Sequence, residues 1–168
     1  MASSRAAAAE GALEADQKLR PRQPPDVTGL RIVLAEDDPT MRQLVALALR
    51  RDGFEVLEVA DGHALARVAD AVAADEIEIC LVISDIRMPG KSGLAMLPIL
   101  RRSISAPPVL LITAFGDPAT HEAAERLGAA GVMDKPFEID DLRTVVWYLA
   151  LGGRKTVCPA PALTGEAT

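Results

Sequence analysis

An acidic run, a single aspartate, a threonine and a lysine each follow a short apolar run of this sequence. Residues 36–38 (EDD) follow the first apolar run, and Asp85 follows another in the segment SDIRMPGKSG. Thr113 follows a third in LITAFG, and Lys135 follows a fourth in MDKPF. If these runs are neighbouring strands of one sheet, the side chains converge on one shallow cleft that holds several carboxylates, one hydroxyl and one ammonium group.

Such a cleft is suited to receiving phosphate. Clustered hard oxygen ligands favour Mg²⁺, which takes one or two carboxylates together with a phosphoryl oxygen. A carboxylate beside Mg²⁺ can accept a phosphoryl group as an acyl phosphate, and the metal and a lysine then offset the charge of the transferred group. The same positive charges explain why neighbouring carboxylates are tolerated, although each pair repels by roughly 4 kcal/mol at about 4 Å in a medium of effective dielectric constant near 20.

Five short apolar runs supply the strands that this cleft needs. Apolar residues at nearly every position are typical of parallel strands covered on both faces. The run at 54–59 alternates more, which indicates an edge strand. The predicted strands are 31–35, 54–59, 79–84, 108–112 and 131–134.

Helical spacing of apolar residues predicts a helix after each strand. The predicted helices begin after Pro39, begin after Asp61, cover 94–104, run from Asp117 to about Gly128, and cover 142–149. Asp38, Asp61 and Asp117 are expected to cap helices. His63 and His121 have no partner at ligand or triad spacing, so we expect them to be exposed helix residues. Five alternating strands and helices predict a doubly wound α/β fold, which binds ligands outside the carboxyl ends of its strands.

The length of 168 residues is sufficient for one domain with flanking segments. Hydrophobic residues make up 49% of the chain and charged residues 25%, which is typical of a globular protein. Residues 1–29 are rich in alanine and end in several prolines, so a flexible N-terminal extension is predicted. Residues 152–168 are predicted to be a flexible C-terminal tail or linker, which leaves 30–151 as the folded domain.

Charge and cysteine content limit the partners and the compartment. The net charge of −6 argues against direct nucleic-acid binding, which needs clustered Lys and Arg. We expect no membrane association, because no apolar stretch reaches spanning length and the N-terminus lacks the apolar core of a signal peptide. Cys80 lies in an apolar run and Cys158 in the C-terminal segment, so we expect no disulfide framework and a cytoplasmic location.

From Leu30 to about Leu151 the chain resembles the receiver domain of bacterial response regulators, the phosphoacceptor half of two-component signalling. The resemblance rests on the acidic pair after the first strand and on the run Asp-x-x-Met-Pro-x-x-x-Gly from Asp85 to Gly93. Thr-Ala after the fourth strand and Lys-Pro-Phe after the fifth complete it. The resemblance implies a flavodoxin-like (βα)5 sandwich whose five-stranded parallel sheet has the order 2-1-3-4-5.

The resemblance also implies the residues of a metal site. Asp85 would be the phosphoacceptor, and Glu36, Asp37, Asp85 and the backbone carbonyl of Arg87 would hold Mg²⁺, with Mn²⁺ as an alternative ion. Asp38 would turn away to cap the helix that Pro39 begins.

Two further residues would act on the phosphoryl group. Thr113 would hydrogen-bond its oxygens and draw the following loop inward, and Lys135 would pair with it, or with Asp85 before modification. The donor would be a phosphohistidine on a sensor histidine kinase or a phosphotransfer protein. The output would be contact with a downstream protein or with an output domain of the same protein, and homodimers are common among members. The chain would not be an enzyme beyond its own phosphoryl transfer and dephosphorylation.

Three positions depart from the family pattern or adjust it. Val132 stands where many members have an aromatic residue that swings inward with the threonine, so the hypothesis is that signalling uses the loop after Thr113 and the face of the fourth helix, fifth strand and fifth helix. Arg87 and Phe115 are large residues beside the site. They are expected to crowd the attacking water and slow self-dephosphorylation.

Other functions fit the residues less well. A Mg²⁺-dependent phosphohydrolase with an aspartate nucleophile would need an Asp-x-Asp pair after the first strand and a cap, whereas this sequence has EDDP and no insertion that could form a cap. A flavin or nucleotide binder would need a glycine-rich phosphate loop there. The receiver portion of a longer DNA-binding response regulator remains an alternative to a stand-alone switch. A scaffold that has lost phosphorylation is disfavoured by the complete acceptor set.

Overall fold

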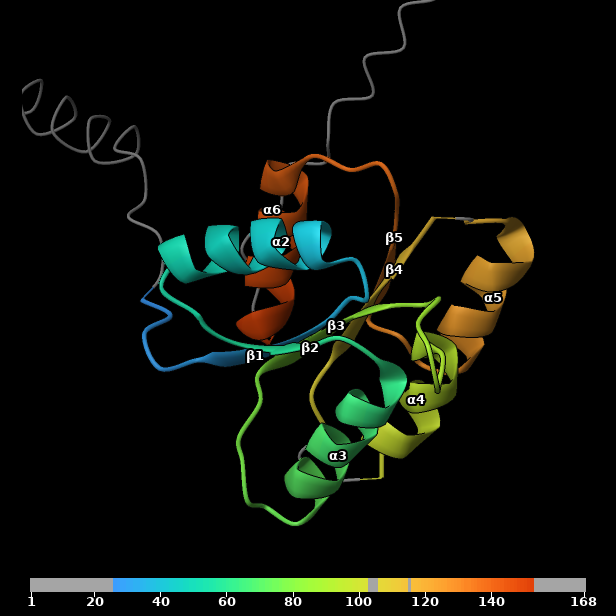
Figure 1. The fold of residues 1–168 in the computed structure, drawn as a ribbon, viewed down its shortest axis with the longest axis horizontal. Coiled ribbons are helices and arrows are strands. Elements are labelled where there is room, and N and C mark those ends of the chain that lie inside the picture. The colour runs from blue at the N-terminus through green and yellow to red at the C-terminus, as the bar shows by residue number, and fades with distance from the viewer. Residues whose placement is uncertain (1–25, 103–105, 115, 153–168) are drawn as a thin grey trace, which may run out of the picture.

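Five parallel strands form one sheet in the order β2-β1-β3-β4-β5, as predicted (Figure 1). They are β1 (Arg31–Ala35), β2 (Glu55–Val59), β3 (Leu81–Asp85), β4 (Val109–Thr113) and β5 (Gly131–Asp134). The computed structural model describes residues 26–102, 106–114 and 116–152. The remainder of both predicted flanking segments lies outside these ranges, as does Phe115, so the domain boundaries stay predictions.

Five helices cover the two faces of the sheet. They are α2 (Pro39–Arg51), α3 (Gly62–Ala73), α4 (Gly93–Leu100), α5 (Pro118–Arg126) and α6 (Ile139–Ala150). In Figure 1, α2 and α6 lie on one side of the sheet and α3, α4 and α5 on the other. Within the described ranges, no helix combines the length and the apolar composition that crossing a membrane would require.

Each face of the sheet has its own apolar core. Val33 and Val82 point to the side of α3, α4 and α5, whereas Ile32 and Ile83 point to the side of α2 and α6. All the residues of β3 and β4 are buried, which is why these strands are apolar almost to their ends: β3 closes with Ser84 and Asp85, and β4 with Thr113. The strand β2 alternates in burial and pairs with β1 alone among the described strands, so the prediction of an edge strand is confirmed.

Aspartate side chains cap three of the helices. The Asp38 carboxylate accepts hydrogen bonds from the backbone N–H groups of Thr40 at 2.7 Å and Met41 at 3.1 Å. Asp61 and Asp117 cap α3 and α5 in the same way. Backbone hydrogen bonds, the largest cause in each, lower the pKa of both Asp61 and Asp117. The three predicted caps are confirmed.

The predicted element ends were wrong by a few residues. Asp85 and Thr113 are the last residues of β3 and β4 rather than the residues that follow them, because the ladder continues to this point. The helix α4 ends at Leu100, with Arg101 as its C-cap, although the predicted helix continued to 104. Ile104 lies outside the described residues.

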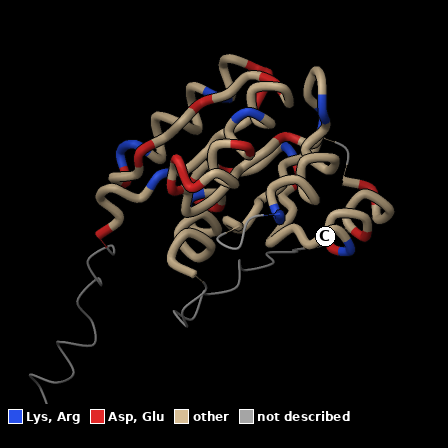
Figure 2. Tube along the Cα trace, turned by 90° about the horizontal axis from the view of Figure 1, so that it is seen from below, with Lys and Arg blue, Asp and Glu red and all other residues tan. Residues whose placement is uncertain are grey.

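Acidic and basic residues are interspersed along the described chain. Figure 2 shows Lys and Arg scattered among Asp and Glu rather than gathered on one element.

Candidate functional site

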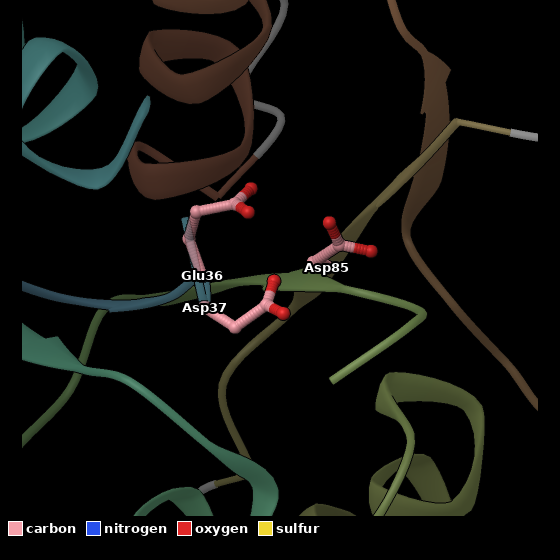
Figure 3. Close-up of side chains that lie close together, drawn as sticks. All are labelled: Glu36, Asp37 and Asp85. Atoms are coloured by element: carbon pink, nitrogen blue, oxygen red, sulfur yellow. The ribbon is translucent and has the colours of Figure 1, made fainter. Parts of the chain in front are cut away.

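Three carboxylates meet at the carboxyl ends of the two central strands. Glu36 and Asp37 directly follow β1, Asp85 ends β3, and these strands are neighbours. One carboxylate oxygen of each residue lies within 4.8 Å of the others, and Figure 3 shows the three side chains gathered at this edge of the sheet. Glu36 is only 2% exposed and Asp85 6%, whereas Asp37 is exposed. The strand order therefore brings the acids together as predicted.

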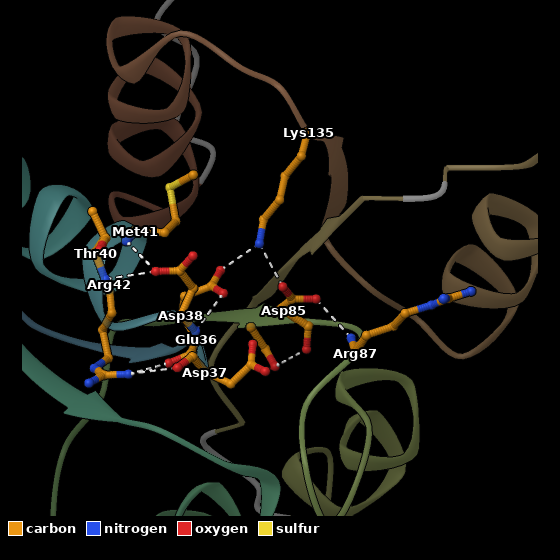
Figure 4. A network of polar contacts seen from close by, with 10 residues as sticks. Glu36, Asp37, Asp38, Thr40, Met41, Arg42, Asp85, Arg87 and Lys135 are labelled. Atoms are coloured by element: carbon orange, nitrogen blue, oxygen red, sulfur yellow. Dashed lines mark hydrogen bonds and ion pairs between the residues drawn. The ribbon is translucent and has the colours of Figure 1, made fainter.

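Lys135 supplies a positive charge to this cluster. Its Nζ donates hydrogen bonds to Asp85 Oδ2 at 2.6 Å and to Glu36 Oε2 at 2.7 Å (Figure 4). Burial lowers the pKa of Lys135, but the hydrogen bonds to Asp85 and Glu36 outweigh it, so the pKa lies above its usual value. The lysine is therefore charged at neutral pH and shared between two acids.

Glu36 is the most enclosed of the acids. Its Oε1 accepts a hydrogen bond from the Asp38 N–H at 3.3 Å, and its own N–H donates to the Val59 carbonyl of β2 at 3.2 Å. Burial raises the pKa of the Glu36 carboxyl, and the Asp85 charge adds to this effect, so that the hydrogen bond from Lys135 does not compensate fully. A second cation would therefore be favourable beside this carboxylate.

Asp85 is held by its neighbours along the chain. The Arg87 N–H donates to Asp85 Oδ1 at 2.8 Å, while the Arg87 side chain extends away from the carboxylates (Figure 4). Gly93, at the start of α4, packs against the Asp85 backbone so closely that a Cβ there would lie 2.5 Å from the Asp85 carbonyl oxygen. The glycine of the Asp-x-x-Met-Pro-x-x-x-Gly run is thus a packing requirement where the loop after Asp85 returns to the end of β3.

Thr113 and Val132 lie beside the site on β4 and β5. Thr113 is 1% exposed, and its carbonyl accepts a hydrogen bond from the Lys135 N–H at 2.7 Å. This bond ties the lysine to the end of β4. Val132 is partly buried on β5 and packs against the α3, α4 and α5 side. Phe115, the second predicted tuning residue, lies outside the described residues.

One pair near the site was missed from the sequence. His121 Nε2 of α5 lies 2.9 Å from Asp134 Oδ1, the last residue of β5, although His121 was predicted to have no partner. Asp134 in turn sits against the backbone of Gly116, so that a Cβ at Gly116 would clash with its carboxylate. The pair is substantially exposed, and pairs of this kind contribute about 0–1 kcal/mol. No local spacing rule joins two residues on different elements, so no signal in the sequence could have found it.

The residues present fit a hard divalent cation. The donor set is three carboxylates with no sulfur or imidazole among them, and such oxygen sets suit Mg²⁺ or Mn²⁺. Lys135 is the ammonium that contacts two of the three acids, so the cluster keeps a negative balance. The exposed Asp37 leaves room for water, which Mg²⁺ retains.

A family model and individual relatives both match this chain, and they point to one protein family. A family model described as the response regulator receiver domain matches residues 32–147. The transcriptional regulatory protein TcrA of Mycobacterium tuberculosis is 38% identical over 117 residues, which are 69% of this chain and 44% of TcrA. The response regulator protein PmrA of Pseudomonas aeruginosa is 38% identical over 117 residues, which are 70% of this chain and 51% of PmrA. The chain thus spans about half, or less, of the length of these relatives.

Solved structures agree with the fold. The chemotaxis response regulator CheY4 of Vibrio cholerae is 27% identical with a TM-score of 0.63, over 73% of this chain and 99% of that one. The receiver domain of the sensor histidine kinase PA1611 from Pseudomonas aeruginosa has a TM-score of 0.64 at 24% identity, over 73% of this chain and 98% of that one. In that protein a magnesium ion is coordinated in the active-site cleft.

Proposed function

Because this chain belongs to the response regulator receiver domain family, we propose that it is a phosphorylation-dependent signalling switch in which Asp85 accepts a phosphoryl group. The observation that supports this most directly is the place of Asp85. It is buried at the end of a central strand, within hydrogen-bond distance of Lys135 and beside Glu36 and Asp37. Three clustered carboxylates that share one ammonium group keep a net negative charge, which suits a cation and a phosphoryl group better than a purely structural role.

The three acids would hold Mg²⁺, or Mn²⁺, together with the backbone carbonyl of Arg87. When bound, the ion would neutralise negative charge on the phosphoryl group during transfer. Glu36 and Asp85 are already fixed by hydrogen bonds from Asp38, Lys135 and Arg87, so little reorganisation of the ligands would be needed. This preorganisation is the protein's own contribution to the site.

Phosphoryl transfer would proceed by attack of an Asp85 carboxylate oxygen on the phosphorus of a phosphohistidine. A P–O bond forms, the P–N bond of the donor breaks, and the electron pair leaves with the donor imidazole. Lys135 would then pair with a phosphoryl oxygen instead of with the free carboxylate. Thr113 would donate its hydroxyl to another phosphoryl oxygen from the end of β4.

The added charge would carry the signal. A phosphoryl group brings about −1.5 to −2 charges at pH 7. On Asp85 this charge would lie next to Thr113, which ends β4, and Lys135, which follows β5. We propose that the loop after Thr113 moves and that the face formed by α5, β5 and α6 changes its contacts. Val132 stands where many members of the family have an aromatic residue, so the proposed change would not include the swing of an aromatic side chain at that position.

The partners proposed follow from this function. A sensor histidine kinase or a phosphotransfer protein would be the donor, and a downstream protein or a second copy of the chain would receive the signal. The relatives described above are named as regulators of transcription and as response regulators, not as classical enzymes. They are longer than the matched region, so the alternative is that this chain is the receiver portion of a DNA-binding response regulator.

The test is phosphorylation by acetyl phosphate with Mg²⁺, read as intact mass. We expect the wild-type protein to gain one phosphoryl group and Asp85→Asn to gain none. Asp117→Asn is the matched control, since it replaces an exposed helix-capping aspartate near the site, and it should be modified like the wild type. An adduct equally abundant in Asp85→Asn would overturn the assignment. The proposed output face needs a separate measurement, the NMR chemical shifts of the protein before and after phosphorylation. Changes confined to regions other than α5, β5 and α6 would overturn it.

A further inference from the structure

Arg42 reaches back from the first turns of α2 to the segment that carries the acidic pair. Its Nη1 donates to the Glu36 carbonyl at 2.7 Å and lies 3.5 Å from the Asp37 carbonyl oxygen (Figure 4). The Arg42 side chain is 17% exposed. One guanidinium group therefore contacts the backbone of both acids at once.

The other side of this guanidinium is anchored on β2. Arg42 Nε lies 3.5 Å from Glu58 Oε2, and the second oxygen of Glu58 accepts a hydrogen bond from Arg50 Nη1 at 2.8 Å. Glu58 thus offsets part of the charge of Arg42. Arg42 joins three parts of the fold: the helix α2, the edge strand β2 and the segment between β1 and α2.

That segment is short and depends on few contacts. Residues 36–38 connect the end of β1 to the start of α2. The Glu36 N–H is held by the Val59 carbonyl, and its C=O is held by Arg42, so the backbone of Glu36 is fixed from two directions. Because two successive carbonyls point to the same guanidinium, the backbone torsions that aim the exposed Asp37 side chain are set by Arg42 as well.

We propose that Arg42 is a positioning residue for the metal site: it holds the Glu36 and Asp37 carbonyls so that their carboxylates stay within reach of the same cation as Asp85. The inference rests on the proposed function, because it assumes that this cluster binds Mg²⁺. For the loss of Arg42, this positioning role predicts the opposite change in cation affinity from an argument based on charge alone. Removing a positive charge near the acids should favour a cation, whereas loss of their positioning should weaken its binding.

The experiment uses Mn²⁺ as the probe and measures the signal of free Mn²⁺ by electron paramagnetic resonance. We expect Arg42→Ala to weaken Mn²⁺ binding about tenfold, as losses of residues that orient metal ligands do. Arg42→Lys should also weaken it, because an ammonium group keeps the charge but cannot reach both carbonyls and Glu58. Arg50→Ala is the matched control: it loses the other contact to Glu58, does not touch the acidic pair, and should leave Mn²⁺ affinity unchanged.

A second measurement needs no metal. Amide hydrogen exchange of residues 36–38 should become faster in Arg42→Ala than in the wild type, and should stay at the wild-type rate in Arg50→Ala. If Arg42→Ala does not fold, Arg42→Lys decides both measurements.

Three results separate the possibilities. Unchanged or tighter Mn²⁺ binding in the Arg42 variants would overturn the inference, as would an equal loss in Arg50→Ala. Absence of Mn²⁺ binding by the wild-type protein would instead overturn the metal site of the proposed function, and the exchange rates would still decide whether Arg42 holds the segment.

Discussion

Lys135 Nζ lies 2.6 Å from Asp85 Oδ2, although β4 stands between β3, which ends in Asp85, and β5, which Lys135 follows. The lysine side chain reaches over the end of β4 and also contacts Glu36 beyond β3. One ammonium group therefore links the ends of three strands of the sheet. Its removal should be felt in both stability and chemistry.

Replacing Lys135 by Met should lower the free energy of unfolding. Glu36 and Asp85 would then be buried carboxylates without their shared cation, and we expect a loss of about 1–3 kcal/mol, less than for a fully buried pair because the lysine is 19% exposed. Urea unfolding at pH 7 measures it, and added Mg²⁺ should recover part of the loss. The exposed Lys91→Met is the control. An equal effect in the control would contradict the assignment.

The acids at the end of β1 should divide into ligands and a cap. Asp37→Ala should weaken Mg²⁺ binding strongly, because Asp37 belongs to the carboxylate cluster. Asp38→Ala should leave binding nearly intact and cost about 1 kcal/mol of stability, because it removes the cap on Thr40 and Met41. Calorimetric titration and urea unfolding of both variants would separate the effects. The reverse order of binding losses would move the ligand register by one residue.

The bulk of Arg87 and Phe115 should set how long the phosphoryl group survives. Arg87→Ala keeps the N–H that donates to Asp85 and removes only the side chain. We expect Phe115→Ala to lose the phosphoryl group severalfold faster, because water gains access to the phosphorus. Arg87→Ala should have a smaller effect, because the Arg87 side chain extends away from the carboxylates (Figure 4). Decay of the purified phosphorylated protein measures the lifetime, with the exposed Arg102→Ala as the control. Lifetimes equal to that of the wild type would show that crowding is not the cause.

Gly93 should tolerate no side chain. A Cβ there would lie 2.5 Å from the Asp85 carbonyl oxygen and 2.9 Å from Ser84 Oγ, and backbone cannot move aside as a flexible side chain can. Gly93→Ala should therefore destabilise the protein by about 1–3 kcal/mol. Gly131→Ala is the matched control, since its Cβ would meet only the end of the Leu110 side chain at 3.3 Å. Thermal unfolding of both compares them, and an equal loss would refute the packing argument.

Cys80 should react slowly as long as the protein is folded. Burial raises the pKa of its thiol from 9.0 to about 11, so folding favours the neutral form. This contribution to stability is complete below pH 9.0 and is lost as the pH rises through about 11. In a Cys158→Ser protein, alkylation by iodoacetamide should have its pH midpoint near 11 when folded and near 9.0 in urea. A folded-state midpoint near 9.0 would disprove the burial effect.

Much of this fold could be predicted because its signals are local. The continuous apolar runs of β3 and β4 record burial on both faces, and the caps of α2, α3 and α5 are carboxylates directly before the helices. The strand ends were misplaced because Asp85 and Thr113 are polar and yet belong to the ladder. Their side chains are of types that favour loops, whereas their backbones still pair with the neighbouring strand.

The site was predictable only as far as strand order determines it. Glu36, Asp85 and Lys135 stand at strand ends, so parallel pairing alone brings them together. Arg42 and the pair of His121 with Asp134 were not predicted, because their contacts depend on the angle at which a helix crosses the sheet. Side chains on a helix surface can reach several neighbours, and spacing along the chain does not decide among them.

Arg50, which contacts Glu58 together with Arg42, also covers the outer edge of the strand β2. Glu55 and Val59 use their backbone groups to pair with β1, so the intervening Val56 carbonyl points outward. Arg50 Nη2 donates to that carbonyl at 2.9 Å. An incoming strand from another molecule would have to break this bond and the Arg50–Glu58 ion pair before it could extend the sheet. The contacts among Arg42, Glu58 and Arg50 therefore also make it harder for another chain to pair with this edge of the sheet.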